Sequence, residues 1–400
     1  MTKRLRSIVV TFASLIAGCS GAPRTPLTTP QQDLRSAKPG VGGVVADPAP
    51  RTGTLGDTSE AAPKVIDLDT IRIQVVRKGP GGDAELTSVA TTDLFNQAVD
   101  ASKNSESSRA IGLFRQLVTE FPESQFAALS LFNIAAIYDG RSELAATLGT
   151  LIELNEKYPD SRKSIEGHLY MVALLTERDR YVEALTSVDQ LLLRRNVSYI
   201  EQVEALARKG YVQIELGQLD SADATLQQAI TAWKQIPRLE DPYFIAMAFY
   251  YRAEIVHRKF AALPVRLPDT QLRKDLDAKE VLASAAYDRW KLALGFRQAY
   301  WATASGYQMS QIFVEFWKAT VTAPFPTAMN VAARPQYVKE VHGRVREHLE
   351  KALNGHQMNV ELAAAYGVET LWSKASKERA ADILTILGNE DRGSFTQPTQ

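Results

Sequence analysis

Cysteine is nearly absent from this chain of 400 residues, which has one, at position 19. A single thiol excludes an internal disulfide framework and any zinc or iron–sulfur site built from thiolates of this chain alone. Neither sign of charge is in excess, because 46 lysines and arginines balance 46 aspartates and glutamates. A neutral chain has no global field that would draw it to nucleic acid, so we expect no nucleic-acid partner.

Histidine is also scarce, and the patterns from which metal and cofactor sites are built are missing. No two of the five histidines are three or four residues apart, the spacing that would put both on one face of a helix. No GxxxxGK[ST] or GxGxxG spacing occurs, so no phosphate-binding turn is expected. We predict no catalytic residue, no metal, no cofactor and no small-molecule substrate. Four tryptophans are interpreted as core residues, with a ligand cage as the alternative: Trp290, Trp301, Trp317 and Trp372.

The apolar run near the N-terminus, from Ile8 to Ala17, is too short to span a bilayer, which takes about 20 apolar residues. It follows the basic residues Lys3, Arg4 and Arg6 and is followed by small residues. This order is typical of export signals. Residues 1–18 are therefore predicted to be a signal peptide.

The single cysteine stands in the sequence Ile16-Ala17-Gly18-Cys19, which resembles the bacterial lipobox. The resemblance implies that the Cys19 thiol receives diacylglycerol, that the chain is cut before Cys19, and that the freed amine is acylated. Several acyl chains would hold the protein durably on a membrane, since each buried methylene contributes about 0.8 kcal/mol. An ordinary cleaved signal with an incidental cysteine is the alternative. Because Ser20 follows instead of aspartate, we expect the outer membrane, with the protein facing the periplasm.

Residues 19–90 are predicted to form the lipidated cysteine and a flexible linker. The segment up to about Pro63 is rich in proline, glycine, threonine, serine and alanine, a composition that buries too little apolar surface to fold. One strand is expected at 65–76, where apolar and polar residues alternate from Leu68 onward. A lone strand would either add to the edge of a partner's sheet or pack on the body of this chain or stay disordered.

From about Thr91 the periodicity becomes helical, and similar passages end at Pro122 and Pro159. Self-similarity at about 34 to 37 residues indicates stacked helix pairs. Residues 91–260 are therefore predicted to form such repeats. Small residues are expected where two helices of a pair cross closely, with the best internal spacing in the fourth unit. These small residues include Ala98, Ala110, Ala135, Ala184, Gly210 and Ala222, whereas Thr147 replaces the usual alanine in the second unit.

These units, with their Phe/Tyr-Pro-Asp/Glu-Ser joints, resemble the tetratricopeptide (TPR) lipoproteins of bacterial envelopes, including BamD-type barrel-assembly lipoproteins and Tol-associated coordinator proteins. The resemblance implies a protein-binding scaffold, in which the first helix of each pair lines a groove that holds peptides. The alternative is that half of the groove residues only pack between repeats. The groove positions correspond to Phe95, Asn96, Phe132, Asn133, Tyr170, Tyr211 and Tyr250.

Residues 261–390 are predicted to form a C-terminal helical domain in which the repeat spacing is lost, followed by a disordered tail at 391–400. One helix is expected from Thr270 to Leu294, and the last two at about 334–353 and 359–387. The pattern resembles the C-terminal halves of TPR lipoproteins from gliding deltaproteobacteria, the Glt/Agl group of adventurous gliding motility. This resemblance implies a part in a trans-envelope motility or transport machine. It is carried by Lys279, Ala286, Tyr287, Trp301-Ala302, Gly306-Tyr307 and the stop at Pro324-Phe325-Pro326.

The sequence thus predicts an all-α fold, a TPR-type helical-hairpin solenoid with a C-terminal helical extension, preceded by a disordered tether. The predicted function is an outer-membrane-anchored periplasmic scaffold, not an enzyme. Its partners would be the membrane, through the anchor at Cys19, and envelope proteins or peptides in the groove. A component of barrel assembly and a regulator of a cell-wall enzyme are the alternatives to a role in gliding machinery.

Overall fold

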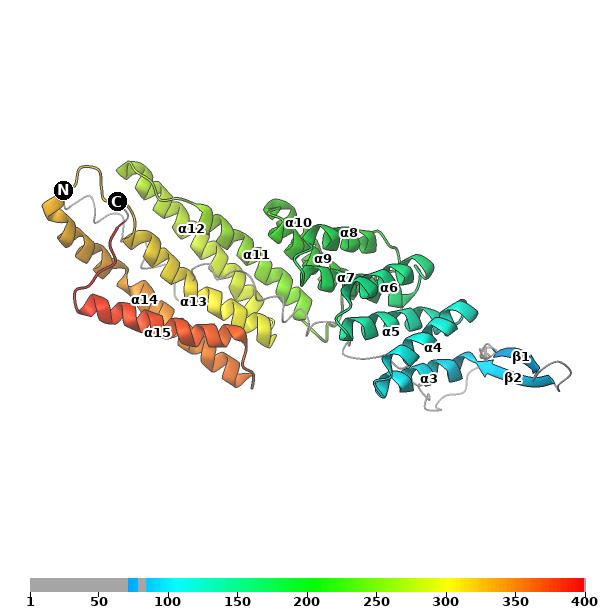
Figure 1. Cartoon of the computed structure of the whole chain (residues 1–400). Helices are drawn as coiled ribbons and strands as arrows, with labels where there is room; N and C mark the ends of the chain where they lie inside the picture. Colours follow the sequence, from blue (N-terminus) through cyan, green and yellow to red (C-terminus); the bar gives the residue numbers. More distant parts are fainter. Residues whose placement is uncertain (1–70, 78–83, 399–400) are drawn as a thin grey trace, which may run out of the picture. The chain divides into compact units, whose positions relative to one another are not determined.

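The computed structural model describes residues 71–77 and 84–398 (Figure 1). The predicted signal peptide, Cys19 and the linker up to residue 70 lie outside these residues. The chain divides into two compact units, whose described parts are residues 71–197 and 198–398. Within the described parts, no helix has the length and apolarity needed to cross a membrane.

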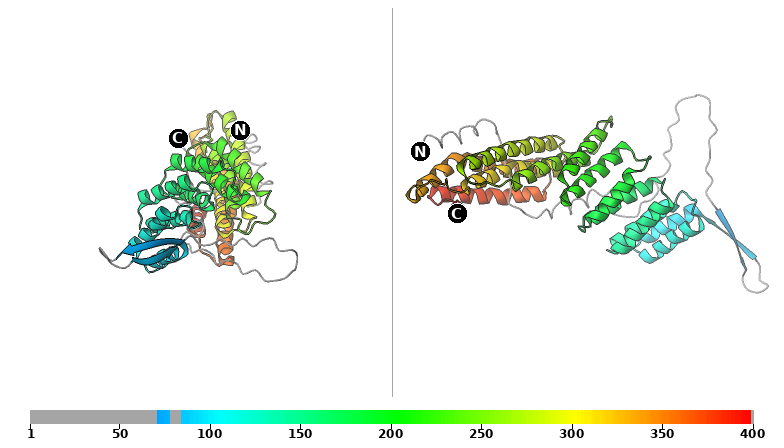
Figure 2. Two further views of the ribbon diagram at one scale, coloured as in Figure 1. Left: turned by 90° about the vertical axis from the view of Figure 1, so that its right-hand side faces the viewer. Right: turned by 90° about the horizontal axis from the view of Figure 1, so that it is seen from above.

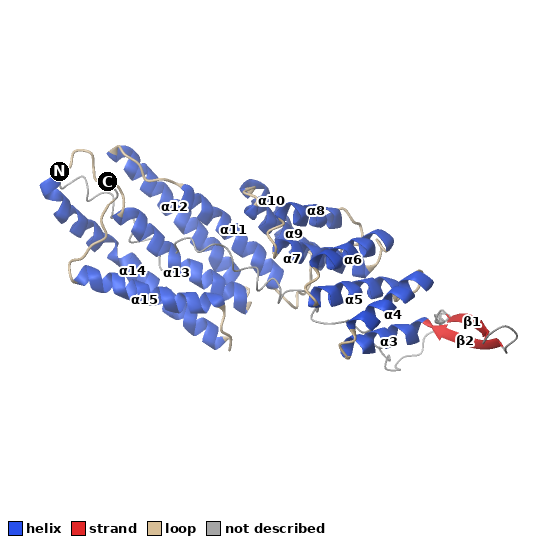
Figure 3. Ribbon diagram, viewed as in Figure 1, coloured by secondary structure: helices blue, strands red, loops and turns tan. Residues whose placement is uncertain are grey.

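The first unit begins with a β-hairpin (Figure 3). Strand β1 (Ile71–Arg77) pairs antiparallel with β2 (Ala84–Ala90), with Ile71 opposite Ala90. A strand was expected at 65–76, but the expectation that it has no sheet of its own to join is wrong. The flexible-linker prediction also fails for β2. The sequence of β2 alternates weakly, so its own pattern does not predict that it pairs with β1.

Three helical hairpins follow in the first unit, and each helix packs against the next along the chain (Figure 2). The predicted all-α architecture of paired helices is confirmed for this part of the chain. The helices are α3 (Thr91–Lys103), α4 (Ser107–Glu120), α5 (Ala127–Gly140), α6 (Leu144–Lys157), α7 (Arg162–Thr176) and α8 (Tyr181–Leu192).

The turn inside each hairpin has one residue in the left-handed backbone conformation, and this residue stands at the same position in every turn. Ser105, Ser142, Asp179 and Gly217 have φ of +64°, +61°, +57° and +75°, and each stands two residues before the second helix of its pair. In each turn the next residue donates its N–H to the carbonyl five residues earlier, at 2.8 to 2.9 Å. This is the Schellman cap, which satisfies the last carbonyls of a helix. The caps repeat at intervals of 37, 37 and 38 residues, so the repeat predicted from the sequence is present in the backbone.

The prolines predicted to separate the units stand directly after the second helix of a pair. Helix α4 ends at Glu120 before Phe121-Pro122, and α6 ends at Lys157 before Tyr158-Pro159. Both residues that precede proline leave the helical region, as the proline ring requires. Proline therefore sets where each pair stops.

The second unit contains the fourth hairpin and the long C-terminal helices (Figure 1). The expected boundary at 260/261 is not the one observed at 197/198, because α11 packs on α9 and α10 as well as on α12. The elements are α9 (Tyr199–Glu215), α10 (Leu219–Trp233), α11 (Tyr243–Ala262), α12 (Asp269–Leu294), α13 (Ala299–Val321), the 3₁₀-helix η2 (Val331–Ala333), α14 (Arg334–Ala365) and α15 (Leu371–Asp391).

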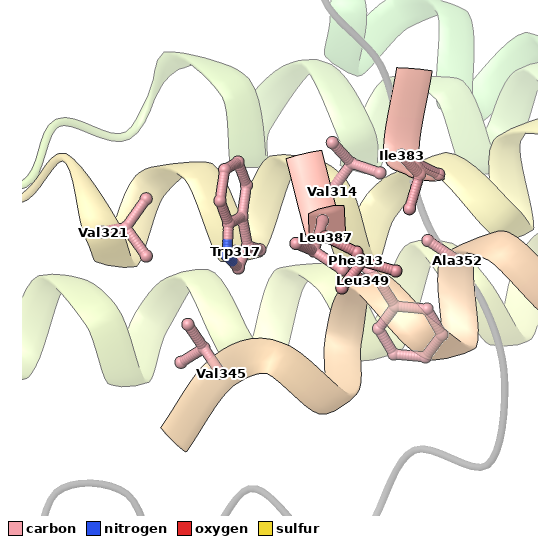
Figure 4. Close-up of a cluster of buried hydrophobic side chains, with 9 residues drawn as sticks. All are labelled: Phe313, Val314, Trp317, Val321, Val345, Leu349, Ala352, Ile383 and Leu387. Carbon is pink, nitrogen blue, oxygen red and sulfur yellow. The ribbon is translucent and has the colours of Figure 1, made fainter. Parts of the chain in front are cut away.

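Helix α14 is continuous where the sequence was expected to break at about residues 354–358. Gly355 lies inside the helix, where it is buried and does not end the helix. The break comes at Gly367, whose φ of +67° is one that glycine adopts without strain. Apolar side chains of α13, α14 and α15 then form one core cluster (Figure 4). Its members are Phe313, Val314, Trp317, Val321, Val345, Leu349, Ala352, Ile383 and Leu387.

The C-terminal segment 392–398 returns to α14, contrary to the expected disordered tail. The ring of Phe395 lies 5.0 Å from that of His342, and His342 Nε2 hydrogen-bonds the carbonyl oxygen of Thr396 at 2.9 Å. Pro398 is buried. A sequence pattern gives no sign of these contacts, because His342 lies about one helix hairpin away along the chain.

Candidate protein-binding surfaces

Six of the seven residues predicted to line a peptide groove are buried. Asn96 is the exposed one, and it lies on α3. Asn133, the other asparagine of the set, is 0% exposed. In this conformation the other six side chains pack inside the repeats, and their role in partner binding stays a prediction. The buried six are Phe95, Phe132, Asn133, Tyr170, Tyr211 and Tyr250.

In the first unit these aromatic side chains connect one helix pair to the next. Phe95 stacks on Phe126, with ring centroids 4.8 Å apart, and so joins α3 to the start of α5. Tyr170 on α7 donates its hydroxyl hydrogen to Asp139 at the end of α5 over 2.6 Å. Burial, and then this hydrogen bond to a carboxylate, raise the pKa of Tyr170 well above its ordinary value. The alternative left open by the sequence, packing between repeats, therefore describes these two residues.

In the second unit the corresponding side chains belong to an aromatic core. The ring centroids of Tyr211 and Tyr251 are 4.8 Å apart, and those of Tyr250 and Trp301 are 5.1 Å apart. Gln308 Nε2 donates to the Tyr250 hydroxyl at 3.3 Å. The interpretation of the tryptophans as core residues is confirmed for Trp290, Trp301, Trp317 and Trp372, which are all buried.

A group of buried and half-buried charged side chains joins α9, α11 and α13, and no pattern in the sequence predicts it. His257 lies 2.9 Å from Glu315 and 3.4 Å from Glu254, while Arg258 pairs with Glu215 at 2.7 Å. Burial lowers the pKa of His257, but the two carboxylates outweigh it and raise that pKa to about 10. The group therefore carries a positive imidazolium at neutral pH. Its members contact one another across three helices, so removal of one partner would leave a charge unpaired at this junction.

The other histidines are also engaged in packing. His168, His342 and His356 are buried, and the ring of His348 stacks on Phe313 at 5.6 Å. Among residues 71–77 and 84–398, no group of three histidine, cysteine, aspartate or glutamate side chains is arranged to hold a metal ion.

An open apolar cleft lies in the second unit, where α10 ends and the turn between α12 and α13 passes beside it. Its volume is about 490 Å³. Trp233 stands at the end of α10, and its ring lies 5.4 Å from that of Phe296 in the α12–α13 turn. Both side chains are half-buried. We call this feature the Trp233 cleft, and its lining is Trp233, Lys234, Ile236, Pro237, Leu239, Pro242 and Phe296.

The Trp233 cleft was missed by reasoning from the sequence. The segment that connects α10 to α11 contains two prolines and alternating polar residues, which are typical of a plain connection. The signal that was there is the set of aromatic residues Trp233, Phe249 and Phe296, which do not fall on the helix-crossing positions of the repeat. Only the fold brings the first of them next to the last.

Comparisons with known proteins add little beyond this description. No family model matches the chain, and no curated relative is found. The chain is similar to the crystal structure of a tetratricopeptide repeat protein from Parabacteroides merdae, with 12% identity and a TM-score of 0.34. That match covers 74% of this chain and 98% of the other. The fold assignment therefore rests on the helix pairs and their repeated caps, and paired helices of this kind suggest a protein-interaction scaffold.

Proposed function

We propose that this protein is a lipid-anchored scaffold of the bacterial outer membrane that faces the periplasm and binds other proteins in a multiprotein envelope complex. The helical hairpins support the scaffold part, since arrays of helix pairs present extended surfaces to protein partners. The observation that carries this part is the Schellman cap repeated at Ser105, Ser142, Asp179 and Gly217. Equivalent caps at nearly constant spacing are what a repeat array requires.

The anchor and the location are supported by the sequence alone. The lipobox-like Ile16-Ala17-Gly18-Cys19 supplies the acylated cysteine, and Ser20 in the following position favours the outer membrane. The likeness of the C-terminal half to the Glt/Agl lipoproteins favours a trans-envelope motility machine as the complex. We therefore place this machine first among the candidate settings.

Crosslinking in intact cells tests the scaffold proposal. The full chain with an affinity tag is crosslinked, and the captured proteins are identified by mass spectrometry against an uncrosslinked control. We expect envelope proteins of a motility or transport complex. Recovery of barrel-assembly subunits in their place would move the proposal to a BamD-like role, and recovery of no protein above the control would refute the scaffold function.

The anchor is tested separately with the Cys19→Ala variant. Cells expressing the wild type or the variant are fed a labelled fatty acid, and membranes are separated by density. We expect label on the wild type in the outer-membrane fraction and no label on the variant. An unlabelled wild type, or a variant that stays in the outer membrane like the wild type, contradicts the lipid anchor.

A further inference from the structure

We propose that the Trp233 cleft docks an acidic peptide segment of a partner protein, which places one large apolar side chain against the rings of Trp233 and Phe296. The inference rests on the proposed scaffold function and names the chemistry of one partner. It places a docking site in the second unit, outside the set of residues that the sequence predicted.

The floor of the cleft is formed by the rings of Trp233 and Phe296, which Phe249 supports from behind the lining, so they are held in place before any partner arrives. Trp233 meets Phe249 of α11 edge-to-face at 6.3 Å and Phe296 at 5.4 Å, and Phe249 and Phe296 are 5.2 Å apart. The three rings come from different elements, so each limits the movement of the others. Half-buried aromatic side chains in a preformed pocket are the usual anchors of protein interfaces. A volume of about 490 Å³ has room for a tryptophan, phenylalanine or leucine side chain.

Two prolines restrict the backbone that forms the wall of the cleft. Pro237 and Pro242 line it, and each has its φ fixed by the pyrrolidine ring. Asp241 Oδ1 accepts the backbone N–H of Tyr243 at 2.9 Å and so fixes the start of α11. A wall that is already ordered loses little conformational entropy when a partner binds.

Charge around the cleft favours an acidic partner. The residues that line the cleft include one cation, Lys234, and no anion. The lining segment 234–242 and the turn residues 295–297 together contain three cations against two anions, although the whole chain is balanced. The other two cations, Arg238 and Arg297, are exposed. Of the two anions, Asp241 accepts a hydrogen bond at the start of α11. Complementary charge sets specificity and the rate of encounter, so glutamate or aspartate should flank the docked apolar side chain.

A displayed library of random peptides tests the inference on the full chain in detergent. It is panned in parallel against the wild type and against two variants: Trp233→Ser, which removes the floor, and the double variant Lys234→Glu with Arg297→Glu, which leaves the aromatic rings in place. We expect the wild type alone to enrich acidic peptides that share one aromatic or leucine residue. The double variant should instead select basic flanks around the same kind of residue. Individual peptides should bind Trp233→Ser at least ten-fold more weakly by fluorescence anisotropy.

The matched control is Leu384→Ala, which removes an exposed apolar side chain of α15 that does not line the cleft. It should enrich the same peptides as the wild type. Enrichment without acidic bias, or selection that is the same on the wild type and the double variant, overturns the inference. If in-cell crosslinking still captures partners while no peptide depends on Trp233, the cleft proposal fails and the scaffold function stands. If crosslinking captures nothing, the scaffold function itself fails.

Discussion

Gly210 of α9 lies so close to Leu226 of α10 that a Cβ at position 210 would be 2.5 Å from Leu226 Cγ and would also collide with its Cδ2. Real Cβ atoms do not approach other atoms so closely, so the fourth hairpin depends on glycine here. In Gly210→Ala, overpacking should cost about 1–3 kcal/mol, and the higher helix propensity of alanine should offset about 1 kcal/mol of this cost. We expect the variant to be destabilised by the difference. Urea unfolding followed by circular dichroism measures the difference.

Two variants separate the close contact from a general effect of alanine. Gly343→Ala, in α14 of the same unit, places a methyl group where nothing lies within 4 Å, so it should stabilise the protein by about 0.5–1 kcal/mol. Leu226→Ala should reduce the additional cost of Gly210→Ala, because the clashing atoms are gone. Equal effects of Gly210→Ala and Gly343→Ala would mean that the helices do not approach as described.

The repeated caps offer a second prediction, because three of the four left-handed residues are not glycine. Left-handed backbone costs a residue with a Cβ about 1–2 kcal/mol, and glycine avoids that cost at the expense of a more flexible unfolded chain. We therefore expect Ser105→Gly to stabilise the protein by about 0.5–1 kcal/mol and Gly217→Ala to destabilise it by about 1 kcal/mol. Thermal and urea unfolding of both variants measure these changes.

Ser102→Gly is the matched control for the caps, since Ser102 lies three residues earlier, inside α3. Glycine there should cost about 0.5–1 kcal/mol. If Ser105→Gly and Ser102→Gly were equally destabilising, the backbone at position 105 would not be left-handed.

Local features of the sequence predicted the repeat, and contacts made across the fold limited the rest. The ends of α4 and α6 follow from proline, and the helix crossings follow from small residues such as Ala110, because both effects act within one hairpin. The burial of Phe95 was not predictable in the same way, because Phe126 of the next hairpin covers it. The pairing of His257 with Glu315 joins residues 58 positions apart that no spacing rule connects.

The His257 group predicts a loss of stability at alkaline pH. The pKa of His257 is raised to about 10 in the folded chain, against about 6.5 for an unperturbed imidazole. A group whose pKa is higher when folded stabilises fully below its unfolded pKa, and that stabilisation is lost as pH rises through the folded pKa. We expect the free energy of unfolding to fall between about pH 6.5 and pH 10.

Glu315→Gln is the variant that isolates this effect. It removes one of the two carboxylates that hold the proton, so the pKa of His257 should fall and the slope of stability between pH 7 and pH 10 should become smaller. Urea unfolding across this range, with NMR titration of the His257 ring, measures both quantities. An unchanged slope in the variant would place the pH dependence elsewhere in the chain.

Arg194 carries the last prediction, because it fastens the end of α8 to the joint between α6 and α7. Its Nη1 donates to the carbonyl oxygen of Pro159 at 2.8 Å and to Ser164 Oγ at 2.7 Å, and its Nη2 donates to His168 Nε2 at 2.9 Å. Burial, and then the charge of Arg194, lower the pKa of His168 to about 4, so the imidazole is neutral and accepts this hydrogen bond. We expect Arg194→Ala to destabilise the protein by about 1–3 kcal/mol, since the buried Ser164 and His168 each lose a hydrogen-bond partner. Arg194→Lys should not restore stability, because an ammonium cannot reproduce the planar fork.

Arg195→Ala, the exposed neighbour, is the control and should change stability by less than about 0.5 kcal/mol. Urea unfolding compares the three variants, and full rescue by lysine would show that charge alone matters at this joint.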